Sequence, residues 1–189
     1  MFLQSASIAV LLGVSTISNV AGSTVTIHQL YGQSHAQREK AIASGNNDAL
    51  WRALNREEIY RRAAVRALIQ TGNLHTGRDY FEAAYIYQHG PNPKDYLLAM
   101  ILAETSVQKG YHKARWWVAA ALDRYLQSIK QPQVFGTQYF PPWTQQPYNA
   151  VLIPDNLRAE FCVPSTREQR KNDVALSRNK PMPYPDGCK

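Results

Sequence analysis

The side chains best suited to chemistry in this chain surround one histidine. His89 stands before a glycine and a proline, at the end of a segment with helical periodicity. The partial negative charge at a helix C-terminus favours the charged imidazolium, so His89 is a candidate general acid or base. The alternative is a histidine that only satisfies the carbonyl groups at the helix end. The polar residues that the fold could bring to it are Asp79, Gln88, Asp123 and Arg124.

A second candidate site is the short segment from Gln131 to Gln138, which reads QPQVFGTQ. Its glycine permits close backbone approach, while its Gln and Thr side chains supply neutral donors and acceptors. This composition suits a neutral or zwitterionic ligand better than acid/base catalysis. The expected ligand-binding residues are Gln133, Gly136, Thr137 and Gln138. The alternative is that these residues satisfy backbone groups inside a buried loop.

Recognisable catalytic and cofactor motifs are absent from the sequence. It contains no G-x-S-x-G elbow, no glycine-rich phosphate loop, no H-E-x-x-H and no EF-hand spacing. The remaining histidines stand in no pattern; they are His28, His35, His75 and His112. We therefore expect no metal and no cofactor. A purely structural Asp123–Arg124 ion pair is an alternative to a catalytic role for these two residues.

The first 23 residues have the layout of a secretory signal peptide. They carry no charged side chain, an apolar run from Ile8 to Val14, and small residues from Ala21 to Ser23. The run is shorter than the roughly 20 apolar residues of a membrane span. We therefore expect cleavage, no transmembrane segment afterwards, and a secreted or periplasmic protein. A buried N-terminal helix and a retained anchor are the alternatives.

The charge distribution narrows the classes of expected partner, and the cysteine content predicts a disulfide. The net charge of +7 is spread without a long Lys/Arg block, so we expect no specific nucleic-acid binding. Four arginines recur along one predicted helix, where they form a solvated face or, alternatively, a polyanion site; they are Arg52, Arg56, Arg62 and Arg66. The two cysteines, Cys162 and Cys188, predict one disulfide in an oxidising compartment.

Hydrophobic periodicity predicts a helical protein. The main helices are expected at residues 46–70, 77–89, 94–109 and 112–129, with shorter ones at 33–44 and 165–177. Residues 23–28 are rich in β-branched side chains and predict an extended segment. On the second helix, Glu57 and Glu58 precede Arg61 and Arg62 by four residues and are expected to pair with them.

Two similar segments suggest repeat-like packing. Phe81-Glu-Ala-Ala84 and Trp117-Val-Ala-Ala120 lie 36 residues apart, close to the period of tetratricopeptide-like helix pairs. We predict an all-α fold of antiparallel helix pairs, followed by a long aromatic, Pro-rich loop that packs across the bundle. The expected divisions are a signal peptide (1–23), an N-terminal extension (24–45), a helical domain (46–178) and a C-terminal tail (179–189).

Several segments together resemble a group of uncharacterised bacterial proteins. These share a Q-H-G turn, an Asp-Arg helix and a Q-x-[FY]-G-T-Q loop, often followed by R-x-x-x-x-V-P-S. The matching residues are Gln88-His89-Gly90, Asp95, Asp123-Arg124, Gln133 to Gln138, Arg158 and Val163-Pro164-Ser165. The resemblance implies a bacterial, helical protein with a site near the loop, and it implies no substrate.

These patterns favour an exported binding or interaction protein of the bacterial envelope, which holds a peptide or a small polar ligand near the Gln133–Gln138 loop. The alternative is a metal-independent hydrolase or isomerase with His89 as general acid/base. Its other groups would be Asp79 or Asp123 to orient the ring, and Arg124 and Gln138 to hold an anionic or carbonyl group. A third interpretation is a structural protein in which both sets are buried and satisfied.

Overall fold

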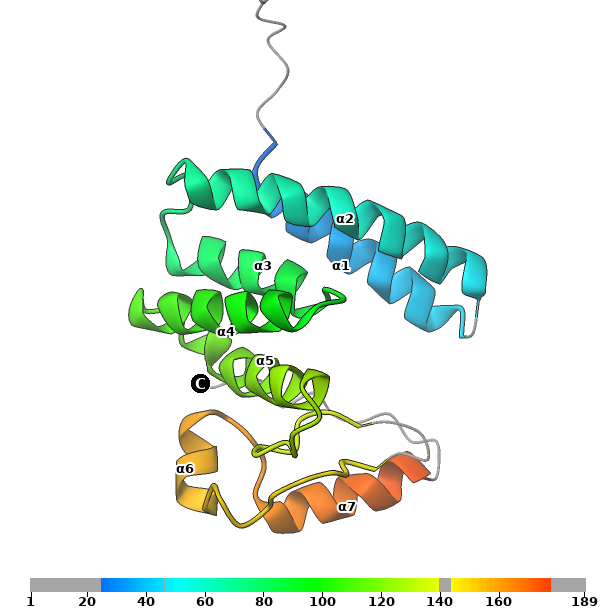
Figure 1. The fold of residues 1–189 in the computed structure, drawn as a ribbon, viewed down its shortest axis with the longest axis vertical. Helices are drawn as coiled ribbons and strands as arrows, with labels where there is room; N and C mark the ends of the chain where they lie inside the picture. Colours follow the sequence, from blue (N-terminus) through cyan, green and yellow to red (C-terminus); the bar gives the residue numbers. More distant parts are fainter. Residues whose placement is uncertain (1–24, 46, 140–143, 178–189) are drawn as a thin grey trace, which may run out of the picture.

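The fold is all-α, as predicted. The computed structural model describes residues 25–45, 47–139 and 144–177. Within these ranges the chain forms seven α-helices and one short 3-10 helix, and no strand. The helices stack in chain order along the long axis, from α1 and α2 at one end to α6 and α7 at the other (Figure 1).

The first helix, α1 (Ile27–Ala43), begins earlier than the sequence analysis predicted. Thr26 accepts a hydrogen bond from the backbone of Gln29, whose side chain binds back to the backbone of Thr26. Ile27 and Leu30 are buried in the main core. The predicted extended segment is therefore wrong at Ile27 and His28, because a capping box and core contacts outweigh β-branched propensity.

The next four helices begin and end close to the predicted residues. They are α2 (Asp48–Gln70), α3 (Gly77–Gln88), α4 (Pro93–Gln108) and α5 (Arg115–Ser128), with the 3-10 turn η1 (His112–Ala114) before α5. The side chain of Asn47 caps α2 and that of Thr76 caps α3.

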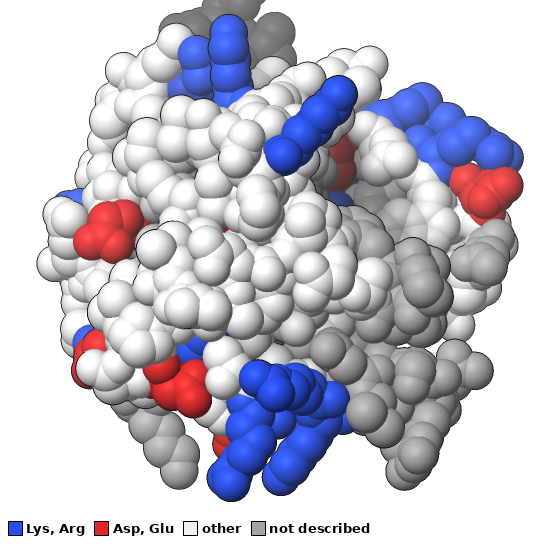
Figure 2. Space-filling model, turned by 60° about the horizontal axis from the view of Figure 1, so that its bottom comes forward, with Lys and Arg blue, Asp and Glu red and all other residues white. Residues whose placement is uncertain are grey.

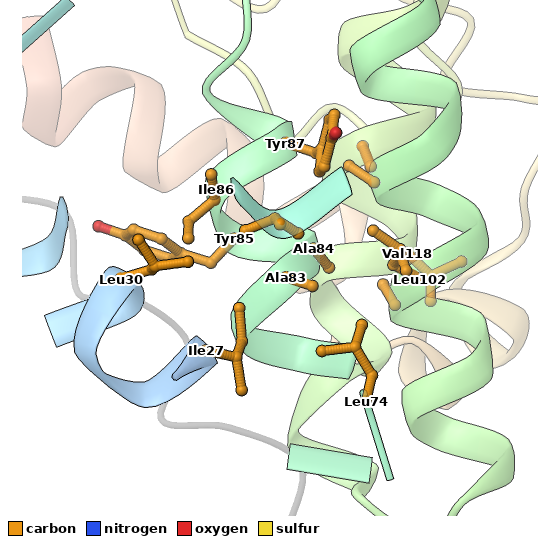
Figure 3. Packing of buried hydrophobic residues seen from close by; sticks show 14 residues of the cluster. Ile27, Leu30, Leu74, Ala83, Ala84, Tyr85, Ile86, Tyr87, Leu102 and Val118 are labelled. Carbon is orange, nitrogen blue, oxygen red and sulfur yellow. The ribbon is translucent and has the colours of Figure 1, made fainter. Parts of the chain in front are cut away.

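Helix α3 is the centre of the core. Small residues let its neighbours approach closely: Ala83 and Ala84 on α3 and Ala120 on α5 are at most 1% exposed. Figure 3 shows α3 side chains packed between those of α1 and of α4 and α5. The rings of Phe81 and Trp117, which begin the two similar segments, lie 5.6 Å apart. The predicted packing of helix pairs is confirmed.

A buried ion pair joins α2 to α1 and corrects the predicted pairing. The Glu58 carboxylate accepts hydrogen bonds from Arg61 at 2.9 Å and from the Ser34 hydroxyl at 2.6 Å. Arg61 also donates to the Gln37 side chain at 2.7 Å. Among the described residues, Glu58 therefore pairs with Arg61 and not with Arg62. On the face drawn in Figure 2, the Lys and Arg side chains lie in several separate groups.

The last part of the described chain wraps the end of the stack. Phe135 of the long loop is buried with Ala119 of α5 and Val163, so the prediction that this loop packs across the bundle is confirmed. Two helices follow, α6 (Asp155–Glu160) and α7 (Thr166–Ser177). A capping box begins α7, because Ser165 and Glu168 bond to each other's backbone N–H groups.

Three predictions fall on residues that the structure does not describe. The predicted signal peptide (1–23), the C-terminal tail (179–189) and Cys188 all lie outside the described ranges. Cleavage, export and the disulfide therefore stay predictions. In the ranges that are described, no helix combines the length and the apolar character that crossing a membrane requires.

Candidate functional site

Asp123 anchors the long loop to α5 from inside the protein. Its carboxylate is fully buried and accepts hydrogen bonds from the backbone N–H groups of Val134, Phe135 and Thr137 at 2.8 to 3.0 Å. The Thr137 hydroxyl donates a fourth bond at 2.8 Å. Burial raises the pKa of Asp123, while these four donors stabilise the ionised form. The residue is a structural acceptor and forms no ion pair with Arg124 among the described residues.

Gln133 and Gln138 hold the loop closed. The Gln133 side chain is fully buried, accepts from the backbone N–H of Gln138 at 2.9 Å, and donates to the carbonyl groups of Gln138 and Gln145. The Gln138 amide donates to the Thr137 hydroxyl at 3.0 Å. These amides are bonded to the protein itself, as the alternative of a buried, internally satisfied loop predicts.

Gly136 is required by the packing of the loop. Its φ is +66°, and a Cβ atom there would lie 2.7 Å from side-chain atoms of both Gln145 and Tyr148. Its carbonyl accepts hydrogen bonds from the side chains of Gln145 and Gln169. The close approach that the glycine permits is therefore made by the protein's own side chains.

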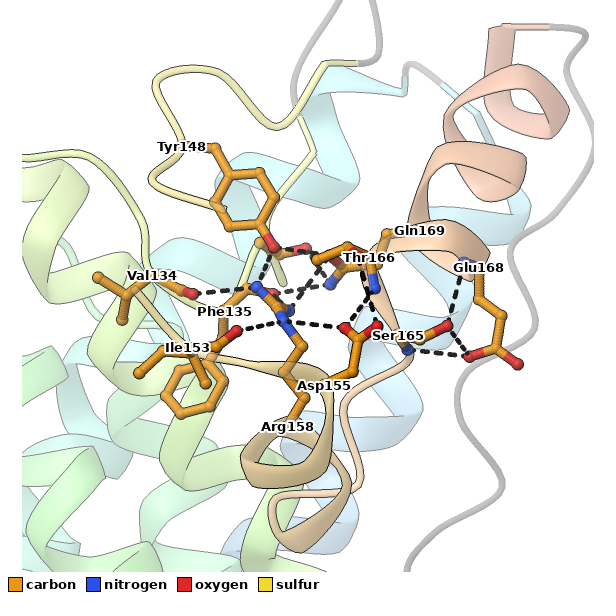
Figure 4. Close-up of polar contacts among 11 residues, drawn as sticks. Val134, Phe135, Tyr148, Ile153, Asp155, Arg158, Ser165, Thr166, Glu168 and Gln169 are labelled. Atoms are coloured by element: carbon orange, nitrogen blue, oxygen red, sulfur yellow. Dashed lines mark hydrogen bonds and ion pairs between the residues drawn. The ribbon is translucent and has the colours of Figure 1, made fainter. Parts of the chain in front are cut away.

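Arg158 holds the other side of the same loop (Figure 4). The guanidinium is fully buried and donates to the carbonyl oxygens of Phe135 at 2.8 Å, Val134 at 3.2 Å and Ile153 at 3.0 Å. It also binds the Tyr148 hydroxyl. One buried anion, Asp123, thus binds the loop's N–H groups, and one buried cation binds its carbonyl groups.

We call these six residues the loop frame: Asp123, Gln133, Gly136, Thr137, Gln138 and Arg158. All six belong to the segments on which the predicted family resemblance rests. The Q-H-G turn also has a packing reason, because a Cβ atom on Gly90 would lie 2.5 Å from Asp95. The contacts therefore explain most of the motif by folding, and ligand binding by the loop stays a prediction.

Arg124 connects the loop frame to the end of α3. Its Nε donates to the Gln138 side chain at 2.8 Å, and its Nη1 donates to the Gln88 carbonyl at 3.1 Å. It also lines a hollow of about 290 Å³ with Tyr96, Gln127 and Ser128. Arg124 and Gln138 thus lie together, as the enzyme interpretation requires, but the two side chains are hydrogen-bonded to each other.

His89 caps the end of α3, and its protonation state is the opposite of the expected one. Burial, then the positive charges of Arg38 and Arg124, hold the pKa of His89 well below its usual value. The expected imidazolium is therefore wrong, because desolvation and two guanidinium groups outweigh the negative helix end. The ring donates from Nδ1 to the Tyr85 carbonyl at 2.8 Å, which leaves Nε2 as a hydrogen-bond acceptor.

Neither predicted carboxylate orients His89. Asp79 accepts hydrogen bonds from the backbone N–H groups of His75 and Thr76 at 2.8 Å, as part of the α3 cap. Burial opposes its ionisation, but these bonds and the nearby His28 hold the pKa of Asp79 below its usual value. His28, which the sequence placed in no pattern, also binds the buried Glu82. The expected carboxylate–histidine pair is absent among the described hydrogen bonds of His89.

His89 instead lines a groove of about 220 Å³ between α1, α3 and α5, which we call the aromatic groove. Its other lining residues are Tyr31, His35, Arg38, Glu39 and Ile42 of α1, Tyr85 of α3 and Trp117 of α5. The ring of Tyr85 lies 5.0 Å from Tyr31, 4.7 Å from His89 and 5.1 Å from Trp117. The groove thus has an aromatic wall, and one arginine and one glutamate also line it.

The contribution of α1 to this groove was not predicted from the sequence. Tyr31, His35, Arg38 and Ile42 recur at intervals of three or four residues, which is the signature of one helix face. This periodicity begins before the predicted helix, because residues 23–28 were expected to be extended and the helix to begin only at residue 33. The Thr26–Gln29 capping box would have identified it.

Comparison of the chain with protein-family models, with curated protein sequences and with solved structures finds no match.

Proposed function

We propose that this protein is an exported helical binding protein of the bacterial envelope, which holds a small polar ligand or one peptide side chain in the aromatic groove. The observation that supports this is the combination of an aromatic wall, two charged lining residues and a neutral histidine in one groove. The loop frame would act indirectly, because Arg124 joins Gln138 to the Gln88 carbonyl beside His89. Export rests on the leader, and a Cys162–Cys188 disulfide would suit that compartment.

The groove chemistry favours a ligand with a carboxylate and an apolar body. A carboxylate suits the guanidinium of Arg38. An aromatic or aliphatic body suits the rings of Tyr85 and Trp117. A donor on the ligand suits Nε2 of His89, which has no hydrogen-bond partner among the described residues. About 220 Å³ is below the ~300–1,000 Å³ of drug-sized sites, so the ligand is small or is one side chain.

The test is a binding titration with N-acetylated amino acids, followed by calorimetry and by tryptophan fluorescence. We expect aromatic members to bind best, and Trp117→Ala and Arg38→Gln each to weaken binding at least tenfold. Trp116→Ala is the matched control, because the neighbouring Trp116 packs against the second core cluster, which contains Phe135. Equal losses for Trp116→Ala and Trp117→Ala, or no binding by any member, would contradict the proposal.

The enzyme alternative keeps one supporting observation. A neutral His89, whose Nε2 lone pair has no hydrogen-bond partner in the described ranges, is in the protonation state of a general base. Its ring is oriented by a backbone carbonyl, which stabilises a developing imidazolium less than a carboxylate does. Hydrolysis of chromogenic esters above the background rate would favour the enzyme over the binding protein, if it is lost in His89→Gln and retained in His112→Gln, an exposed histidine outside the groove.

A further inference from the structure

A second groove lies on the other side of the C-terminal end of α3. It has a volume of about 660 Å³, and its polar lining residues are Arg62 and Arg66 of α2, Tyr87 of α3, and Asn92, Lys94 and Asp95 at the start of α4. Tyr87 and His89 are two residues apart, which is about 200° around a helix. Figure 3 shows Tyr85 pointing toward α1 and Tyr87 pointing away from it.

Positive charge dominates this groove. Arg62 and Arg66 enter from α2, and Lys94 enters from a segment almost 30 residues later in the chain. Asp95 is its one acidic lining residue. The Asp95 carboxylate is already used in the α4 cap, where it accepts from the backbone N–H and the side chain of Asn92 at 3.3 Å.

Arg62 lacks the acidic partner that the sequence predicted. Glu58, four residues before Arg62, is buried against α1 with Arg61. In the described part of the chain, no ion pair within 4.0 Å includes Arg62, Arg66 or Lys94. Three cations that face one groove without a carboxylate partner repel one another, and an anion in the groove would relieve that repulsion.

Tyr87 forms part of the groove wall and connects it to α2. Its hydroxyl donates to the Arg62 carbonyl at 3.0 Å, which ties α3 to α2 at the groove. Burial raises the pKa of Tyr87 although a hydrogen bond from Arg66 opposes that rise, so the phenol is neutral at physiological pH. The wall therefore adds a polar group without adding negative charge.

We propose that this groove binds the phosphate group of a ligand. A single arginine satisfies a carboxylate in bidentate geometry, whereas the several oxygens of a phosphate can accept from two guanidinium groups and an ammonium at once. The N-terminus of the 16-residue helix α4 adds partial positive charge at the same place. A lipid headgroup and a soluble phosphate compound present this same group. The site is independent of the ligand in the aromatic groove.

The experiment measures binding of pyrophosphate by calorimetry at low salt, and co-sedimentation with phosphatidylcholine vesicles with and without phosphatidylglycerol. The test variant is the double substitution Arg62→Gln, Arg66→Gln. The matched control is Arg52→Gln, Arg56→Gln, which removes the same charge from the same helix outside the groove. Lys94→Gln is a milder variant that probes the groove from α4. Circular dichroism verifies that each variant is folded.

We expect pyrophosphate binding, a loss of at least tenfold in the Arg62/Arg66 variant, about threefold in Lys94→Gln, and less than twofold in the Arg52/Arg56 control. Retention by phosphatidylglycerol vesicles that pyrophosphate competes away, with the same order of variants, identifies a lipid headgroup as a source. Binding of pyrophosphate without vesicle retention identifies a soluble phosphate compound. Equal losses in both double variants, equal competition by acetate, or no binding to either probe would overturn the proposal. None of these results depends on N-acetyl amino acid binding, so failure of one site is distinguishable from failure of the other.

Discussion

The helix stack from Ile27 to Ser128 and the loop region from Gln131 to Gln169 are stabilised by different kinds of contact. In the stack, α3 is covered by α1, α4 and α5 through alanine, leucine and aromatic side chains. In the loop region, fewer apolar side chains are buried, and the chain is held by the hydrogen bonds of Asp123 and Arg158. A regular helix satisfies its own backbone, whereas an irregular segment needs side chains to do so.

This difference predicts how the stability of each region responds to substitutions. Apolar packing is spread over many residues, so truncation of one side chain weakens the stack but leaves most of its packing contacts in place. The loop frame depends on two charged groups that each hold three or more backbone groups, and loss of one leaves buried polar atoms unsatisfied. Substitutions in the loop region should therefore have large, local effects, while substitutions in the stack should have global ones.

The largest effect is expected for Arg158→Met. The methionine keeps most of the volume but removes the donors to three carbonyl groups, which should destabilise the loop region by about 3–5 kcal/mol. Hydrogen exchange would show lost protection between residues 131 and 169, with α3 and α4 unchanged. Arg167→Met, at an exposed position, is the control and should change little. Uniform loss of protection through α3 would contradict the separation of the two regions.

The next effect is expected in the stack, for Leu102→Ala. Leu102 is 3% exposed in the main core, so its truncation should lower the free energy of unfolding by about 3 kcal/mol. Chemical denaturation should show a lower midpoint with an unchanged slope, because the whole stack unfolds together. Leu97→Ala on the same helix is more exposed and serves as control. A loss confined to residues 131–169 would break the comparison.

A smaller but local effect is expected for Asp123→Asn. One acceptor oxygen becomes an amide donor that faces N–H groups, at a cost of about 2–3 kcal/mol. Amide exchange at Val134, Phe135 and Thr137 should accelerate before exchange in α5 does. Asp48→Asn is the matched exposed control. Protection at these three amides equal to that of the unsubstituted protein would show that the carboxylate is not their anchor.

The smallest effect concerns pH and His89. The folded pKa lies below the unfolded value of about 6.5, so the unfolded state binds more protons as pH falls below 6.5. This histidine should therefore lower stability on acidification by up to about 1.4 kcal/mol per pH unit, and contribute no slope above pH 7. Urea unfolding at several pH values should show a shallower acid slope in His89→Gln than in the unsubstituted protein. An identical slope in His89→Gln would mean that the ring is not held neutral.

Local signals in the sequence determined the helices. The caps at Asn47, Thr76 and Ser165 and the apolar periodicity involve residues within about four positions, which is the range over which a helix forms. The start of α1, which lies six residues before the predicted one, had a local signal as well, in Thr26 and Gln29. The composition also indicated correctly that the aromatic loop packs on the bundle.

Tertiary structure alone decided the roles of the polar residues. The partner of Glu58, the neutral state of His89 and the use of Asp123 as an anchor each depend on burial by segments far away in the chain. The same holds for the aromatic groove, whose walls come from Tyr31, Tyr85 and Trp117. Desolvation and hydrogen-bond geometry depend on which segments meet in space, and helix periodicity does not contain that information.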